Sequence, residues 1–343
     1  MRKNLYKVLI LFTGLLLMVG CEKEDIKVLI DPNAVEDFEI NGLTLDNFPF
    51  MDCSTSTSPL RDMVMYELLD IPYHWGIDYI SGSMYTIYRG LPDGMVQGSD
   101  EHKEFDRKLR ERLLISSGSH GAFVNLIEGT SGVIIDSRDI SRNELQYAKE
   151  RGVQIETKPI AWDALVFIVN PKNKVKSLTS DQIRKIYTGE ITNWKKVGGA
   201  DHEIHPYTRD TDSGSQEKME TLVMKGLKMK EWPEMILSSM LSPFYSVEID
   251  EWGIAYTPYY FCVRMVNDLR NVNVLSVDGV APSSESILKG AAGGSRNAYP
   301  FFSNIYSAVS EDEPEETYSR QLYRWLSTPR AKTIINESGY IAQ

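Results

Sequence analysis

The sequence predicts an α/β protein, in which short buried strands alternate with amphipathic helices. One continuous apolar run, Leu165 to Val169, ends at Asn170-Pro171 and is typical of a buried strand. Apolar residues with helical spacing repeatedly follow clusters of Ser and Thr and end at a glycine. The chain has 343 residues, and at roughly 100–200 residues per domain this length predicts two domains with a core each.

The composition is that of a folded globular protein, with 42% hydrophobic and 25% charged residues. There are 48 Asp and Glu against 37 Lys and Arg, so the formal net charge is −11. This balance excludes a nucleic-acid partner, because it supplies no basic field. It does not exclude a small anion, since salt confines surface charge to about 8 Å and a cleft sets its own local field.

Residues 1–20 predict a bacterial lipoprotein signal peptide. A basic start is followed by an apolar run at 8–19, which is too short to span a bilayer of about 20 apolar residues. The run ends in L-M-V-G-C at 17–21, which resembles a lipobox and predicts lipidation of Cys21. Residues 21–39 then read as an acidic tether. We expect the protein on the periplasmic side of a bacterial membrane, held only by lipid, with the cell surface as an alternative. An ordinary cleaved signal or a buried strand is the other interpretation of the segment.

The other two cysteines, Cys53 and Cys262, are predicted to be free thiols. An exported protein can form disulfides, but the sequence does not show that these two lie close together.

Helix boundaries are marked by capping signals. Thr179 and Gln182 have the spacing of a capping box, and Gly189 ends the helix that follows. Ser141 and Glu144 make a second capping box, after a predicted strand at 133–135.

Three further helices begin in small or hydroxyl residues, at 54–60, 119–122 and 213–216. A fourth segment with a hydroxyl residue, at 136–138, follows the predicted strand at 133–135. Plain N-capping is the usual role of each Ser or Thr. Their repetition, with glycine and arginine beside them, favours an anion site. Helix N-termini present unpaired N–H groups, hydroxyls add donors, and arginine supplies a forked charge that fits a tetrahedral oxyanion.

Longer motifs carry a family resemblance. They are A-L-V-F-I-V-N at 164–170, L-T-S-D-Q-I-R-K-I-Y-T-G-E-I-T-N-W at 178–194, R-D-T-D-S-G-S at 209–215 and V-D-G-V-A-P-S at 277–283. In these runs the chain resembles the periplasmic phosphate-binding proteins of ABC importers. The similarity extends from about residue 52 to 339, and it is poor at 61–118 and 226–248.

The resemblance implies a two-lobed periplasmic-binding-protein-like fold. Each lobe would be a sheet flanked by helices, and crossing strands would join the lobes around a ligand cleft. Lobe 1 would comprise residues 40–160 and 300–343, and lobe 2 residues 161–299.

The resemblance also implies a set of ligand-binding residues, carried over position by position, and two departures from the usual pattern. Cys53 stands where the family usually has glycine. Arg138 stands where some members have an aspartate that accepts the proton of hydrogen phosphate, so an acceptor would have to come from Asp136, Asp210 or Asp212. The implied ligand-binding residues are Thr55, Ser56, Ser119, Ser137, Arg138, Arg209, Ser213, Gly214 and Ser215.

The predicted function is capture of inorganic phosphate in the interlobe cleft and delivery to an ABC permease, by a monomer without cofactor. The alternative is a surface lipoprotein of the same fold that binds another oxyanion or acts in adhesion or sensing. No enzyme is expected. A phosphatase would need a nucleophile such as Ser213 with His120 as its base, and no orienting group is evident. The five histidines show no metal-ligand spacing.

Overall fold

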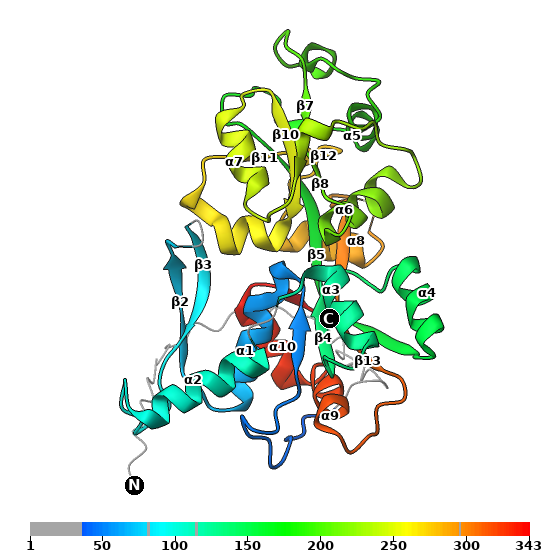
Figure 1. The fold of residues 1–343 in the computed structure, drawn as a ribbon. Coiled ribbons are helices and arrows are strands. Elements are labelled where there is room, and N and C mark those ends of the chain that lie inside the picture. The colour runs from blue at the N-terminus through cyan, green and yellow to red at the C-terminus, as the bar shows by residue number, and fades with distance from the viewer. Residues whose placement is uncertain (1–35, 81–82, 114–115, 295) are drawn as a thin grey trace, which may run out of the picture. The chain divides into compact units, whose positions relative to one another are not determined.

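One long strand, β5 (Ile155–Val169), organises the fold, because its two ends pair in different sheets. The computed structural model describes residues 36–80, 83–113, 116–294 and 296–343, which belong to one compact unit. In Figure 1, β5 runs as a single green strand between two groups of strands and helices. The predicted signal peptide, Cys21 and most of the predicted tether lie outside the described residues.

The described strands form one eight-stranded mixed sheet and three two-stranded sheets, β2 with β3, β6 with β12 and β8 with β9. The order along the main path is β1-β4-β13-β5-β10-β7. The remaining strands are β1 Met51–Cys53, β2 Tyr73–Asp78, β3 Met84–Arg89, β4 Val133–Asp136, β6 Ser177–Leu178, β7 His205–Pro206, β8 Thr208–Arg209, β9 Ile236–Leu237, β10 Gly253–Pro258, β11 Asn273–Val274, β12 Ser276–Val277, β13 Phe302–Ser310 and β14 Ile341–Ala342.

The pairing of β5 divides the sheet into two parts. Residues 155–164 of β5 pair antiparallel with β13, which pairs in turn with β4, and β1 lies parallel to β4. Residues 165–169 pair antiparallel with β10 and β11. The partner thus changes between Ala164 and Leu165, four residues after the predicted lobe boundary, which stays a prediction.

Helices flank both parts of the sheet. In the described residues α3 and α9 contact β4, α7 and α6 contact β10, and α8 contacts both β5 and β13. The helices are α1 Ser58–Leu68, α2 Asp100–Leu113, α3 Gly118–Ile127, α4 Arg142–Arg151, α5 Ser180–Tyr187, α6 Gly214–Lys218, α7 Ser242–Ile249, α8 Ser284–Ala291, α9 Tyr318–Trp325 and α10 Pro329–Ser338.

The core explains why the apolar run of β5 is uninterrupted. Every side chain from Ala164 to Val169 is fully buried, because helices cover the strand where it joins the two parts of the sheet. Phe167 contacts the rings of Tyr187, Tyr256 and Phe301. The predicted buried strand at 165–169 is therefore confirmed as the last third of a longer one.

Both predicted capping boxes are present. Thr179 accepts a hydrogen bond from the backbone of Gln182 at the start of α5, and Ser141 accepts one from Glu144 at the start of α4. Gly189 follows α5 with a φ of +81°, in the left-handed region that ends a helix. The expected α/β class is confirmed.

The poorly matched segment 61–118 contains the β2–β3 hairpin and α2, which Figure 1 draws beside α1. None of the helices in the described part of the chain is both long and apolar enough to cross a bilayer.

Candidate functional site

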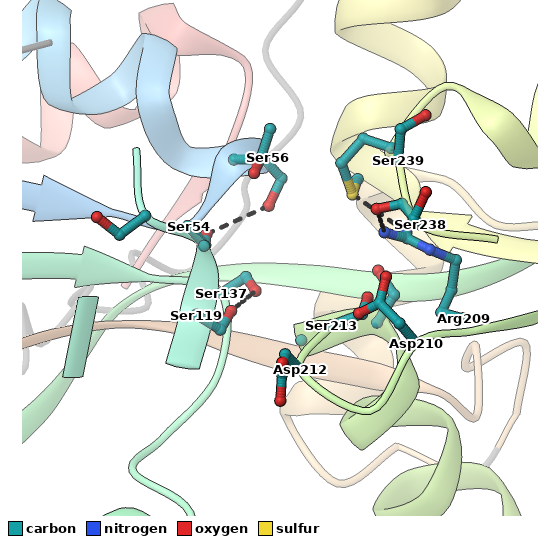
Figure 2. A pocket seen from close by; sticks show the side chains of 16 residues that line it. Ser54, Ser56, Ser119, Ser137, Arg209, Asp210, Asp212, Ser213, Ser238 and Ser239 are labelled. Atoms are coloured by element: carbon teal, nitrogen blue, oxygen red, sulfur yellow. Dashed lines mark hydrogen bonds between the residues drawn. The ribbon is translucent and has the colours of Figure 1, made fainter. Parts of the chain in front are cut away.

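A cavity of about 400 Å³ opens where several helices begin. Figure 2 shows its two walls. One wall carries Ser54, Ser56, Ser119 and Ser137, and the other carries Arg209, Asp210, Ser238 and Ser239. Eight of the nine predicted ligand-binding residues line this cavity, and Arg138 does not. The lining residues are Ser54, Thr55, Ser56, Ser117, Gly118, Ser119, Ser137, Arg209, Asp210, Asp212, Ser213, Gly214, Ser215, Ser238, Ser239 and Met240.

The helices around the cavity begin without a side-chain cap. Ser54 precedes the 3-10 turn η1 (Thr55–Thr57), Ser117 precedes α3 and Ser213 precedes α6, and none of these N-cap side chains bonds the first turn of its helix. By contrast, α4, α5, α8, α9 and α10 all have a capping Ser or Thr. The cavity is thus lined by helix starts whose N–H groups and hydroxyls are not used for capping, which suits an anion.

Side-chain hydrogen bonds fix the loop before α1. Thr57 donates through Oγ1 to the Ile135 carbonyl at 2.7 Å, and its Oγ1 lies 2.9 Å from Ser54 Oγ. The Tyr340 hydroxyl donates to the Ser56 carbonyl at 2.9 Å from the far end of the chain. These contacts tie the loop to β4 and to the C-terminal segment, so its hydroxyls are held in place before any ligand binds.

Asp52, on β1, holds the loop before α3. Its Oδ1 accepts from the backbone N–H of Ser117 at 3.0 Å and from that of Cys53 at 2.7 Å. Its Oδ2 accepts from Asn125 Nδ2 at 2.7 Å. The carboxylate therefore sets where α3 begins, and with it the position of Ser119.

The two walls meet most closely at Gly214, the first residue of α6. A β-carbon built on Gly214 would lie 2.4 Å from Ser119 Oγ and 2.9 Å from Ser137 Oγ. The two serine hydroxyls are themselves 3.4 Å apart and both residues are buried. Only glycine leaves room here, which explains the residue between Ser213 and Ser215 by close approach.

Arg209 brings positive charge to the opposite wall. Its Nε donates to the Leu237 carbonyl at 2.9 Å and its Nη2 to the Ser238 carbonyl at 3.4 Å, which orients the guanidinium toward the cavity. Burial lowers the pKa of Arg209 from its ordinary value, although an arginine remains charged. Among the described residues Arg209 forms no ion pair within 4.0 Å, and the neighbouring Asp210 opposes the lowering of its pKa only in part.

The prediction that Arg138 binds the ligand finds no support in its position. Its Nη1 and Nη2 donate to the two oxygens of Glu144 at 2.8 and 2.6 Å, and Nη1 also donates to the Asp139 carbonyl. Its Nε lies 2.7 Å from Glu217 Oε2, an ion-pair contact without hydrogen-bond alignment. Both Nη groups of the guanidinium are thus paired with Glu144, and the prediction that Arg138 touches the ligand stays a prediction.

Half of the lining lies outside the predicted set of ligand-binding residues. Ser54, Ser117 and Gly118 adjoin predicted residues, and Asp210 and Asp212 were named only as candidate proton acceptors. Ser238, Ser239 and Met240 lie in the poorly matched segment 226–248. A Ser-rich stretch before Pro243, the second residue of α7, was the signal that could have found them.

Catalytic and metal constellations do not form at the cavity. His120 Nδ1 lies 3.0 Å from Glu144 Oε1, and His120 is not among the lining residues, so it is not paired with Ser213. Within the described ranges no three His, Cys, Asp or Glu side chains are grouped to hold a metal ion. The arrangement suits recognition of an anion by hydroxyls, N–H groups and one arginine.

Comparison with known proteins identifies the superfamily of this chain. The sequence profile of a PBP superfamily domain matches residues 93–326. The chain belongs to this superfamily.

Relatives with curated names agree with this placement. The chain is similar to the phosphate-binding protein PstS of Borreliella burgdorferi, with 26% identity over 66% of this chain and 76% of the relative. It is also similar to PstS of Staphylococcus haemolyticus, with 27% identity over 72% of this chain and 79% of the relative. The resemblance found in the sequence is thereby confirmed.

Solved structures support the two-lobed PBP fold. A putative phosphate ABC transporter substrate-binding protein from Clostridium perfringens, solved with bound phosphate, superposes with a TM-score of 0.59 at 22% identity, over 87% of this chain and all of that one. An ABC-type phosphate transport receptor from Vibrio cholerae gives a TM-score of 0.56 at 21% identity, over 85% and 99% of the two chains. The expected fold is confirmed.

Proposed function

We propose that this protein captures inorganic phosphate in the cavity and delivers it to an ABC permease. Relatives whose names state phosphate binding, and a phosphate-bound structural neighbour, support this choice of ligand. The protein acts by binding, not by turnover, and needs no general base or cofactor.

One observation carries the proposal above the others. Arg209 is a buried cation with no carboxylate within ion-pair distance in the described residues, and it faces a cavity rich in serines, among which Ser117 and Ser213 do not cap the helices that they precede. A buried charge without a counterion is costly. A bound phosphate would supply that counterion and accept the hydroxyl and N–H donors at the same time.

The mechanism follows from the two walls. Ser54, Ser56, Ser119 and Ser137 belong to the part of the sheet that holds β1 and β4, whereas Arg209 and Ser213 belong to elements that contact β10. We assign the walls to lobe 1 (residues 40–160 and 300–343) and lobe 2 (residues 161–299). Rotation of the lobes about the crossing strands would close the cavity, exclude water and strengthen each charge-assisted hydrogen bond.

Two carboxylates in the lining bear on the choice of anion. In Figure 2 Asp210 lies beside Arg209, and Asp212 lies farther from it, near Ser213. A carboxylate can accept the proton of hydrogen phosphate, whereas sulfate has no proton to offer and would be repelled. These two residues replace the acceptor that Arg138 does not provide, and they favour phosphate over sulfate.

The cellular setting is part of the same proposal. A signal peptide at residues 1–20 and a lipid on Cys21 would hold a monomeric binding domain outside the cytoplasm, through the tether at 21–39. Metabolic labelling with a fatty acid tests the lipid, with Cys21→Ser as the control that removes it. Size-exclusion chromatography with light scattering tests the monomer.

Isothermal titration calorimetry tests the ligand. Phosphate should give saturable heat with the wild-type protein, sulfate should give none, and Arg209→Ala should weaken phosphate binding by at least about 30-fold, which corresponds to about 2 kcal/mol. Heat with another oxyanion and none with phosphate would change the ligand. Release of phosphate from model esters would instead favour an enzyme, and permease and ATPase genes beside this one would favour transport over adhesion or sensing.

A further inference from the structure

A buried carboxylate, Asp136, lies behind the hydroxyl wall of the cavity. It is the last residue of β4, directly before Ser137, and its side chain has no exposed surface. Its Oδ1 accepts from the backbone N–H of Arg138 at 3.2 Å, and its Oδ2 has no hydrogen-bond partner among the described residues. Asp136 is therefore a buried acid that is only half satisfied, one residue from the proposed anion site.

Charged groups face Asp136 from several elements. Arg138 follows it on the same segment, Glu144 lies on α4, and Lys218 lies on α6. Lys218 is itself buried, its Nζ makes no hydrogen bond, and the nearest carboxylate, Asp163 on β5, is 4.0 Å away. Since Lys218 follows Gly214 by four residues, it is on the same face of the helix that meets Ser119 and Ser137.

The surroundings of Asp136 bring its pKa close to neutral pH. Burial raises the pKa of Asp136 to about 7, although the Arg138 guanidinium and the Ser119 hydroxyl lower it in part. Burial also lowers the pKa of Lys218, while Asp163 and Asp136 oppose that shift. A change of charge in the cavity can therefore change the proton occupancy of Asp136.

Ser119 links the acid to the cavity, because a hydroxyl has only one proton to donate. Ser119 lines the cavity 3.4 Å from Ser137 Oγ, and its hydroxyl lowers the pKa of Asp136 in part, so a charge on Asp136 and a bound anion would both attract that proton. An ionised Asp136 attracts the Ser119 proton away from the ligand. A protonated Asp136 can donate to Ser119 Oγ instead, which leaves the Ser119 proton free to bind an anion.

We propose that Asp136 takes up a proton when an anion occupies the cavity, so that anion binding is proton-linked, and that Lys218 sets the pH at which this happens. The inference rests on the proposed function, since it requires an anion at this site. Asp136 is a positioning residue in this scheme: it acts through Ser119 and does not touch the ligand. The sign follows from like charges, because a bound anion favours the neutral form of a neighbouring acid.

Calorimetry in buffers of different ionisation enthalpy measures the linkage. The slope of the observed heat against buffer ionisation enthalpy gives the number of protons taken up on binding inorganic phosphate. Phosphate titrates near pH 7 itself, so the informative quantity is the difference between the wild type and Asp136→Asn at each pH from 6 to 9. The wild type should take up more protons, by up to about one, with the largest difference above pH 7.

Two further variants provide a second test and a control. Lys218→Met should move the pH of maximal proton uptake upward, because loss of the buried cation raises the pKa of Asp136 further; this arm remains informative if Asp136→Asn does not fold. Thr257→Val is the control, because it removes a buried hydroxyl on β10 that also lacks a hydrogen-bond partner. It should leave the number of protons taken up on phosphate binding unchanged.

The outcomes separate the two proposals. Phosphate heat with equal slopes in the wild type and Asp136→Asn, or with no shift in Lys218→Met, would overturn the proton linkage and leave the proposed function standing. Absence of phosphate heat in the wild type would overturn the proposed function and this inference with it.

Discussion

Gly214 and Ser119 approach so closely that a β-carbon added to the glycine would lie 2.4 Å from the serine Oγ. The two residues belong to α6 and α3, which sit on opposite walls of the cavity. The two residues line the proposed anion site, and the hydroxyl of Ser119 cannot move far because Ser119 is buried.

We therefore expect Gly214→Ala to weaken phosphate binding by at least tenfold, since the methyl group must push Ser119 and Ser137 out of position. Overpacking of this kind costs about 1–3 kcal/mol of unfolding free energy. Calorimetry and urea denaturation measure the two effects. Ser119→Ala removes the clashing oxygen, so Gly214→Ala should cost less in that background; an equal cost in both backgrounds would contradict the close approach.

Arg138 and Arg209 should behave differently when truncated, although both were predicted to bind the ligand. Arg138→Ala leaves the buried Glu144 without its guanidinium partner, so the unfolding free energy should fall, by up to about 3–5 kcal/mol. Arg209→Ala removes a cation that has no carboxylate partner, so it should reduce phosphate affinity with little loss of stability. Denaturation and calorimetry of the two variants side by side distinguish the roles, and a larger stability loss in Arg209→Ala would contradict the assignment.

Asp136 predicts how stability depends on pH. Burial raises its pKa from 3.8 to about 7, so between these values the folded protein binds more protons than the unfolded chain. Its contribution is therefore a cost that is absent below about pH 4 and complete above about pH 7. At about 1.4 kcal/mol per pKa unit, the full cost is on the order of 4 kcal/mol.

Asp136→Asn lacks this cost and should be more stable than the wild type at pH 8 by up to that amount, with little difference at pH 4. Urea denaturation at both pH values measures the effect. A stability difference that is the same at pH 4 and pH 8 would contradict the assigned pKa.

The thiols of Cys53 and Cys262 should be unreactive in the folded protein. Both are buried and free, and burial raises the pKa of each to about 12. A thiol reagent at pH 8 should label both only after denaturation, because the thiolate is the reactive form. Peptide mapping by mass spectrometry locates the label, and rapid labelling of either residue under native conditions would show that it is exposed.

Local signals in the sequence predicted much of the fold. The apolar run before Asn170-Pro171 is the last third of β5, and the Thr179–Gln182 box starts α5, because both depend on neighbouring residues alone. The pairing of the two halves of β5 with different strands depends on contacts between distant segments, and no local pattern encodes it.

The candidate site likewise combines features that local sequence predicts with features that depend on distant contacts. Serines at helix starts could be found from spacing, and eight of the nine predicted residues line one cavity. The contacts of Arg138 could not be predicted from spacing, because they depend on the positions of Glu144 and Glu217 in the folded chain. Ser238 and Ser239 arrive through β9, whose pairing with β8 brings the segment 236–240 to Arg209.

The central claim is that the cavity binds a phosphate between Arg209 and the serine hydroxyls. A crystal structure of the protein grown with phosphate tests it most directly. The account predicts tetrahedral density in the cavity, with oxygens within hydrogen-bond distance of the Arg209 guanidinium and of Ser213. Density that shows an empty cavity at saturating phosphate, or an anion bound elsewhere without contact to Arg209, would contradict it.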